Sequence, residues 1–224
     1  MMLKFSKLRM SGGLSNNKLS YVIMNNKKIK TKILSIYPDL IEIVGFYFFR
    51  DYSHVLAGFS CEFTPRRVYV SKVFYPLFDR VGFLHLSYSS RILSLVNQPK
   101  VLSGGSDISL PEKINSVISL NYSSMKSSCN LDGFNRFLSE RVSNTSNPVV
   151  KQTYAMCLIL LDQFDPAIEW LSVALSSERA EIKANFRDDC LTLLNLVEKN
   201  PIECKLLLNS WEEDRRDALS LGAN

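Results

Sequence analysis

The chain has 224 residues and a mass of 25.5 kDa, and its 46% hydrophobic and 22% charged residues exclude a disordered, collagen-like or coiled-coil protein. Two histidines and no Cys/His cluster exclude most zinc sites and most histidine acid–base chemistry, and no stretch reaches the ~20 consecutive apolar residues that span a bilayer. The net charge of +5 divides into +10 for residues 1–100, with 15 Lys and Arg against 5 Asp and Glu, and −5 for residues 101–224.

Residues 1–105 are predicted to form a basic α+β domain. The apolar spacing from Leu19 to Tyr37 fits an amphipathic helix, which Pro38 ends. Segments rich in Val, Phe, Tyr and Ile follow, and the short connections between them require antiparallel pairing. We therefore expect the helix to pack on a four-stranded antiparallel meander. Its strands are predicted at Ile41–Phe49, His54–Phe63, Arg67–Tyr75 and Phe83–Tyr88.

Residues 106–224 are predicted to form an acidic, all-helical domain. The boundary falls within Asn97–Pro111, where prolines and a Ser-Gly-Gly-Ser run interrupt the apolar pattern. Pro148 and Pro201 suit the first turns of helices. The expected helices are 112–120, 131–142, 149–162, 166–176, 181–199 and 201–219, with a loop at Ser123–Asn130. The predicted fold class is α+β, a β-meander with a flanking helix followed by a helical-hairpin region.

The segment 149–176 has the residue pattern of two antiparallel helices that cross closely. Small residues at a crossing let the backbones approach, and large apolar residues fill the groove between the helices. In these respects the segment resembles one tetratricopeptide repeat, and the resemblance implies a helical hairpin suited to docking another protein. The pattern occurs once, so we expect one hairpin and no repeat array. The predicted packing residues are Ala155, Leu158, Phe164, Ala167, Leu171 and Ala174.

The two histidines are the only catalytic candidates that we find. His54 and His85 both lie in predicted strands of the basic half, and strand pairing could bring them together, with Asp51 or Asp79 orienting one of them. Such a pair would suit phosphodiester chemistry. The alternative is that each is a core or rim residue of the sheet. No phosphate-binding loop, nucleophile elbow or metal-binding helix motif is present, so we predict no metal and no cofactor.

Other residue types that often carry chemistry have a structural explanation here. The acidic pair Asp188-Asp189 and the run Glu212–Asp214 lie beside arginines on predicted helices, where ion pairs within the helix account for them. The five cysteines are odd in number and widely spread, which favours reduced, buried thiols. Reduced thiols and the lack of an apolar leader predict a cytoplasmic protein without a secretory signal.

These observations favour a non-catalytic protein that binds another protein. The opposed charges of the two halves and the helical hairpin suit docking, and a Ser-, Asn- and Lys-rich composition favours a bacterial accessory gene. An immunity-type protein or a subunit of an antiviral defence or toxin–antitoxin assembly is the expected setting. The alternative is a nucleic-acid-binding subunit that uses the basic half. Its candidate contact residues are Arg50, Arg66, Arg67, Lys72 and Arg80.

Overall fold

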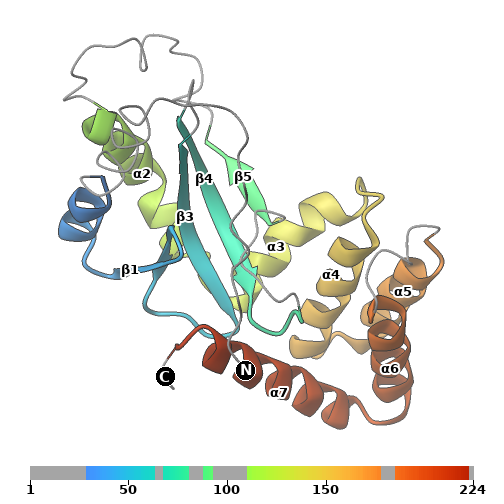
Figure 1. The fold of residues 1–224 in the computed structure, drawn as a ribbon. Helices are drawn as coiled ribbons and strands as arrows, with labels where there is room; N and C mark the ends of the chain where they lie inside the picture. The colour runs from blue at the N-terminus through green and yellow to red at the C-terminus, as the bar shows by residue number, and fades with distance from the viewer. Residues whose placement is uncertain (1–28, 64–67, 81–87, 93–109, 178–184, 222–224) are drawn as a thin grey trace, which may run out of the picture.

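The strands of the N-terminal part form one antiparallel sheet. The computed structural model describes residues 29–63, 68–80, 88–92, 110–177 and 185–221. Five strands lie in chain order across the sheet, and helices follow, which confirms the predicted α+β class (Figure 1). The strands are β1 (Leu40–Ile43), β2 (Phe46–Phe49), β3 (Val55–Phe63), β4 (Val68–Pro76) and β5 (Ser89–Arg91).

The segment predicted as one strand at Ile41–Phe49 is instead the hairpin of β1 and β2. Ile43 pairs with Phe46 across a two-residue turn, in which both Val44 (φ 51°) and Gly45 (φ 84°) have positive φ. A turn of this kind matches the right-handed twist of the two strands. The prediction was wrong because an unbroken apolar run resembles one buried strand, and valine is not a residue that signals a positive φ.

The other predicted N-terminal elements are found in part. The helix expected from Leu19 to Tyr37 is helical at 29–36, and its remainder before residue 29 lies outside the described residues. The last predicted strand, Phe83–Tyr88, is described only at Tyr88. The observed edge strand is β5, and Tyr88 precedes it, its carbonyl accepting a hydrogen bond from the Phe74 amide at 2.8 Å. Positions 83–87 lie outside the described residues.

Within the described residues, the C-terminal part contains six helices, close to the predicted positions. The helix predicted at 112–120 is longer, and part of the loop expected at Ser123–Asn130 is helical. Met125 is buried there, and the Ser124 hydroxyl donates to the Asn121 carbonyl within the helix, so a serine-rich stretch remains helical. The helices are α2 (Leu110–Lys126), α3 (Leu131–Val142), α4 (Pro148–Leu160), α5 (Phe164–Leu175), α6 (Phe186–Lys199) and α7 (Pro201–Ala218).

Asparagines begin three of these helices. Asn130, Asn147 and Asn200 each accept a hydrogen bond from a backbone amide in the first turn of α3, α4 and α7. Prolines in the first turn of α4 and α7 have no amide hydrogen to leave unpaired. This local chemistry explains why the helix starts after residues 130, 147 and 200 were predictable from the sequence.

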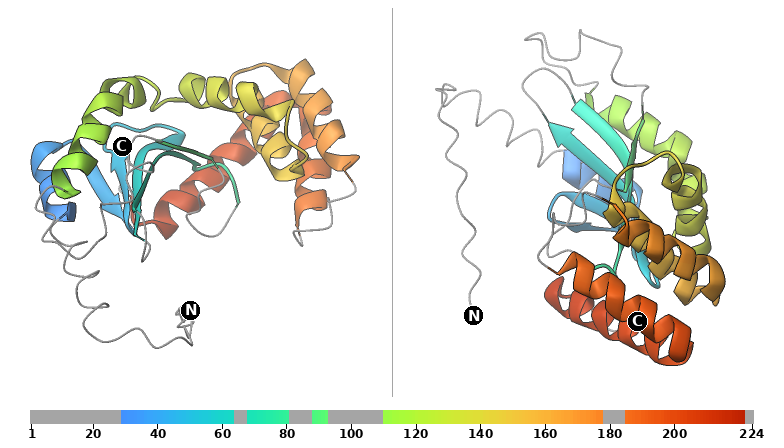
Figure 2. Two further views of the ribbon diagram at one scale, coloured as in Figure 1. Left: turned by 90° about the horizontal axis from the view of Figure 1, so that it is seen from above. Right: turned by 90° about the vertical axis from the view of Figure 1, so that its right-hand side faces the viewer.

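One hydrophobic core extends from the sheet into the helices. Alternate residues of the strands face α2 and α3, and Phe74 of β4 packs on Phe134 and Phe137 of α3 with ring centroids 5.6 and 4.7 Å apart. The same cluster continues into α4, α5, α6 and α7. Figure 2 shows α2 along one side of the sheet and α7 running from the helices back to it. The division near residue 105 stays a prediction, and the buried residues of both parts are contiguous.

The opposite face of the sheet carries a second, smaller cluster. Phe48 of β2, Leu56 of β3 and Val73 of β4 are buried there, and Leu221, beyond the end of α7, packs among them. The chain after α7 therefore returns to the sheet and covers part of this face. Helix α7 is held at both ends, because it follows the tight turn after α6 and ends against the sheet.

Candidate functional site

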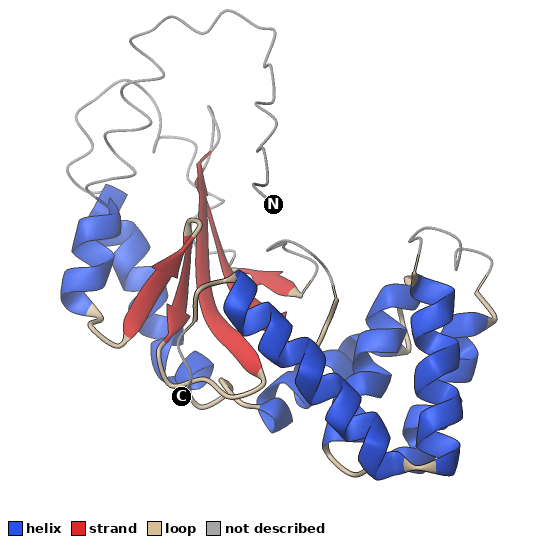
Figure 3. Cartoon of the chain, turned by 60° about the horizontal axis from the view of Figure 1, so that its bottom comes forward, coloured by secondary structure: helices blue, strands red, loops and turns tan. Residues whose placement is uncertain are grey.

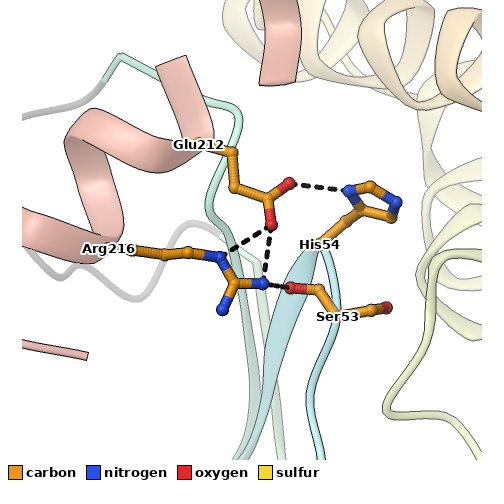
Figure 4. Close-up of polar contacts among 4 residues, drawn as sticks. All are labelled: Ser53, His54, Glu212 and Arg216. Carbon is orange, nitrogen blue, oxygen red and sulfur yellow. Dashed lines mark hydrogen bonds and ion pairs between the residues drawn. The ribbon is translucent and has the colours of Figure 1, made fainter. Parts of the chain in front are cut away.

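The most strongly connected polar cluster joins the start of β3 to α7. His54 immediately precedes β3, and its Nδ1 lies 2.6 Å from Oε2 of Glu212 on α7 (Figure 4). The Glu212 side chain is only 8% exposed, whereas the His54 ring is 36% exposed. A carboxylate at Nδ1 selects the tautomer that has its proton there and leaves Nε2 as an acceptor.

Arg216, one helical turn after Glu212, completes the cluster. Its Nε and Nη2 lie 2.9 and 2.7 Å from Oε1 of Glu212, a two-point contact that holds the carboxylate in one orientation. Nη2 also donates to the Ser53 carbonyl, and the guanidinium lies 5.0 Å from the centre of the Tyr52 ring. The buried carboxylate therefore has a partner on each oxygen, one from the sheet side and one from its own helix.

This arrangement corrects two predictions about charged residues. The structure gives His54 Glu212 as its carboxylate partner in place of Asp51 or Asp79, and His85 lies outside the described residues. Glu212 does form the predicted ion pair within its helix, but it also reaches across to the sheet. The contact could not be read from the sequence because 158 residues separate its partners. The four-residue spacing of Cys204, Leu208 and Glu212, which all lie on the buried side of α7, is the signal that was missed.

His54 could act as a base only with a substrate cleft and a reacting group beside Nε2. In the described part of the chain, its ring hydrogen-bonds to Glu212 and to no second side chain. The groove described below is formed by the other end of α7. The geometry therefore supports His54 and Glu212 as the contact that positions α7 on the sheet.

A second polar cluster lies between the sheet and the helices and is more deeply buried. Asp79, after β4, is 5% exposed, and its Oδ2 accepts hydrogen bonds from the Tyr88 hydroxyl at 3.2 Å and the Thr153 hydroxyl at 3.1 Å. Burial raises the pKa of Tyr88 well above its ordinary value, so the phenol stays protonated and can donate. Arg215 of α7 donates to the Asp79 carbonyl at 3.3 Å. The cluster thus links the sheet to α4 and α7, and the Arg215 Nε within it is buried without a hydrogen-bond partner.

Three of the five basic residues proposed for nucleic-acid contact are described, and each donates within the protein. Arg50 Nε bonds to the Pro38 carbonyl at 3.2 Å and Lys72 Nζ to the Ser124 hydroxyl at 3.3 Å. Arg80 Nη1 bonds to Asp189 of α6 at 2.7 Å. Asp189 was predicted to form an ion pair within its own helix, and this prediction was wrong. Burial raises the pKa of Asp189 despite Arg80. Arg66 and Arg67 lie outside the described residues.

The helical hairpin of α4 and α5 has small side chains where the two helices meet. Ala155, Ala167, Leu171 and Ala174 are fully buried and Leu158 nearly so, whereas Phe164 is half-buried at the start of α5. Outside this contact, the rings of Tyr154 and Trp170 meet edge to face at 5.6 Å. The hairpin is packed by residues of the sizes that its sequence predicted.

The cysteines of the described chain are free, and Cys157, Cys190 and Cys204 are buried as expected, whereas Cys61 and Cys129 are only partly buried. Burial raises the pKa of Cys61, Cys157 and Cys190 to about 12 and that of Cys204 to about 11, which makes these thiols poor nucleophiles. Among the residues with described positions, no three His, Cys, Asp or Glu side chains gather into a possible metal site. Within the same ranges, no helix combines the length and apolarity needed to cross a membrane.

A shallow groove lies where the α4–α5 turn meets the α6–α7 turn. It encloses about 570 Å³ and is lined by Phe164 and the first half of α7, with polar residues at its rim. Ile202 and Leu206, four residues apart on α7, are 73% and 62% exposed there. Asp162 and Lys205 form an ion pair at 2.8 Å across the groove. This feature was not predicted, because an aliphatic residue on a helix is ordinarily assigned to the core.

A scan of family models, a search of curated proteins and a search of solved structures each found no match. The resemblance of 149–176 to a tetratricopeptide repeat therefore rests on the residues quoted for it. The structural features that bear on function are the two polar clusters and the groove beside α7.

Proposed function

We propose that this protein is a non-catalytic module that binds another protein through the groove formed by Phe164, Ile202, Lys205 and Leu206, hereafter the α7 groove. The observation that carries the proposal is the exposure of two large aliphatic side chains, one helical turn apart, on a helix whose opposite side carries the buried Cys204 and Leu208. Moving such a side chain out of water contributes roughly 1.5–3 kcal/mol. A partner that covers both gains a substantial part of a binding free energy.

The polar clusters support this proposal by making α7 a rigid platform. The contacts of Glu212 with His54 and of Arg216 with the Ser53 carbonyl fasten the far end of the helix to the sheet, and Asn200 caps its first turn beside the groove. A helix held at both ends presents Ile202 and Leu206 in a fixed arrangement, and little conformational freedom is lost when a partner binds. Figure 3 shows α7 as the long helix that runs from the helical stack to the strands. An accessory or immunity-type subunit is the kind of protein that we propose.

Site-specific photo-crosslinking tests the proposal. A benzophenone amino acid is placed at Leu206 in the full chain, which is then produced and irradiated in cells of its own source. We expect a covalent adduct with a protein, because a bound partner lies within a few ångströms of this position. The matched control carries the same group at Leu120, which is 82% exposed on α2, away from the groove (Figure 1). An adduct pattern at Leu206 no different from that at Leu120 would contradict the proposal.

A further inference from the structure

The α7 groove has a charge pattern that narrows the choice of partner. Ile202 and Leu206 form an apolar stripe, and helical spacing places Glu203 on one flank of the stripe and Lys205 on the other. Glu203 is exposed, and Lys205 is 30% exposed. A stripe with opposite charges on its two flanks does not favour a strongly charged partner such as a nucleic acid, because neither sign dominates.

The stripe is complementary to a second copy of itself. When two identical helices pack side by side in parallel about a two-fold axis, the left flank of one faces the right flank of the other, as in a parallel coiled coil. Glu203 of each copy would then face Lys205 of the other. The ammonium of Lys205 has three donors, so it can keep Asp162 and also meet Glu203 of the second copy.

We infer that the α7 groove binds the α7 helix of a second copy, so that the protein assembles as a two-fold symmetric dimer. The inference rests on the proposed function, and it identifies the docked protein as this same chain. Ile202 packs against Ile202, and Leu206 against Leu206, of the second copy. These two side chains line the α7 groove, and Phe164, which also lines it, borders the contact.

The dimer is tested by sedimentation velocity on the purified full chain over a range of concentrations. We expect a species of twice the 25.5 kDa chain mass that becomes more populated as concentration rises. Leu206→Asp should leave only monomer, because a carboxylate would be buried in the apolar contact. Leu120→Asp, at an exposed leucine on α2, should dimerise like the unchanged protein.

Charge reversal tests the arrangement of the two helices. Glu203→Lys and Lys205→Glu each place like charges across the contact, and each should weaken dimerisation about fivefold, since two exposed ion pairs are lost together. The double variant with both changes restores opposite charges and should recover the original affinity. An antiparallel arrangement brings like flanks together and predicts no such recovery.

The outcomes separate this inference from the proposed function. A monomer at every concentration, or a dimer that survives Leu206→Asp, overturns the inference. If the crosslinker at Leu206 then still captures a different protein, the proposed function stands and the second copy is not the partner. If position 206 forms no specific adduct and the chain is monomeric, both are wrong.

Discussion

Val44 has a positive φ angle, which a β-branched residue rarely adopts. It lies at φ 51° in the turn between β1 and β2, a region that a β-branched residue enters only at a steric cost of roughly 1–2 kcal/mol. Its side chain is 78% exposed, so packing does not offset the cost. The hairpin forms nevertheless, because Phe48 and Phe49 of β2 are buried on opposite faces of the sheet and require the strand to turn back here.

Replacing Val44 should therefore stabilise the protein. Val44→Asn relieves the strain, since asparagine tolerates positive φ at this turn position, and should raise the free energy of unfolding by about 0.5–1 kcal/mol. Urea unfolding followed by circular dichroism measures the change. Val173→Asn is the matched control, because Val173 is also exposed but lies within α5, where asparagine brings no such gain. An equal shift in both variants would show that backbone strain is not the cause.

At the scale of elements, α7 is one of the helices that join the sheet to the helical part. Its buried face combines Cys204 and Leu208, which pack among the helices, with Glu212, which reaches the sheet. A periodic apolar pattern is enough to predict that α7 is a helix. It cannot predict that one carboxylate of this helix is buried against a histidine from a distant strand.

Removing the Glu212 side chain should lower the free energy of unfolding more than removing the His54 side chain. Glu212→Ala leaves Arg216 and His54 without their shared partner in a mostly buried position and should lower the free energy of unfolding by about 2–3 kcal/mol. His54→Ala leaves the carboxylate still paired with Arg216 and should cost about 1 kcal/mol. Equilibrium urea unfolding measures both changes.

A double-mutant cycle isolates the contact itself. The combined variant should be less destabilised than the sum of the single variants, by up to about 1 kcal/mol, because the two side chains touch. Glu213→Ala, at the exposed neighbouring carboxylate, should change stability by less than about 0.5 kcal/mol. Additive effects of His54→Ala and Glu212→Ala would show that the contact contributes nothing to holding α7 on the sheet.

At the scale of the whole molecule, the shared core bears on whether the chain unfolds in one step or two. The main cluster of buried residues extends from Ile29 through the sheet to Leu208 of α7 without a break between its parts. The hydrogen bonds of Asp79 with Thr153 and of Glu212 with His54 also join the sheet to the helices. Elements that share buried contacts lose them together, so we expect one cooperative unit.

Native-state hydrogen exchange tests this expectation. The slowest amides of β3, in the sheet, and of α4, in the helical part, should exchange with the same free energy and respond equally to urea. Exchange followed by mass spectrometry on peptic fragments gives both values in one experiment. A difference of several kcal/mol would mean that the parts unfold separately and would favour the predicted division near residue 105.

The sequence by itself determined most of the local structure of this protein, the β1–β2 turn and the end of α2 excepted. The prolines at positions 148 and 201, the apolar periodicity of the helices and the short strand connections each act over a few residues, and they predicted the α+β order correctly. The small residues Ala167 and Ala174 predicted a close helix crossing for the same reason. These features depend on neighbours in the chain, which the sequence displays directly.

Only the tertiary structure decided which distant residues meet. It gave His54 the partner Glu212 and gave Arg50, Lys72 and Arg80 partners elsewhere in the chain. It also placed Ile202 and Leu206 on the exposed side of α7. The physical reason is that a contact between residues far apart in the chain depends on how whole elements pack. One sequence read alone carries no record of that packing.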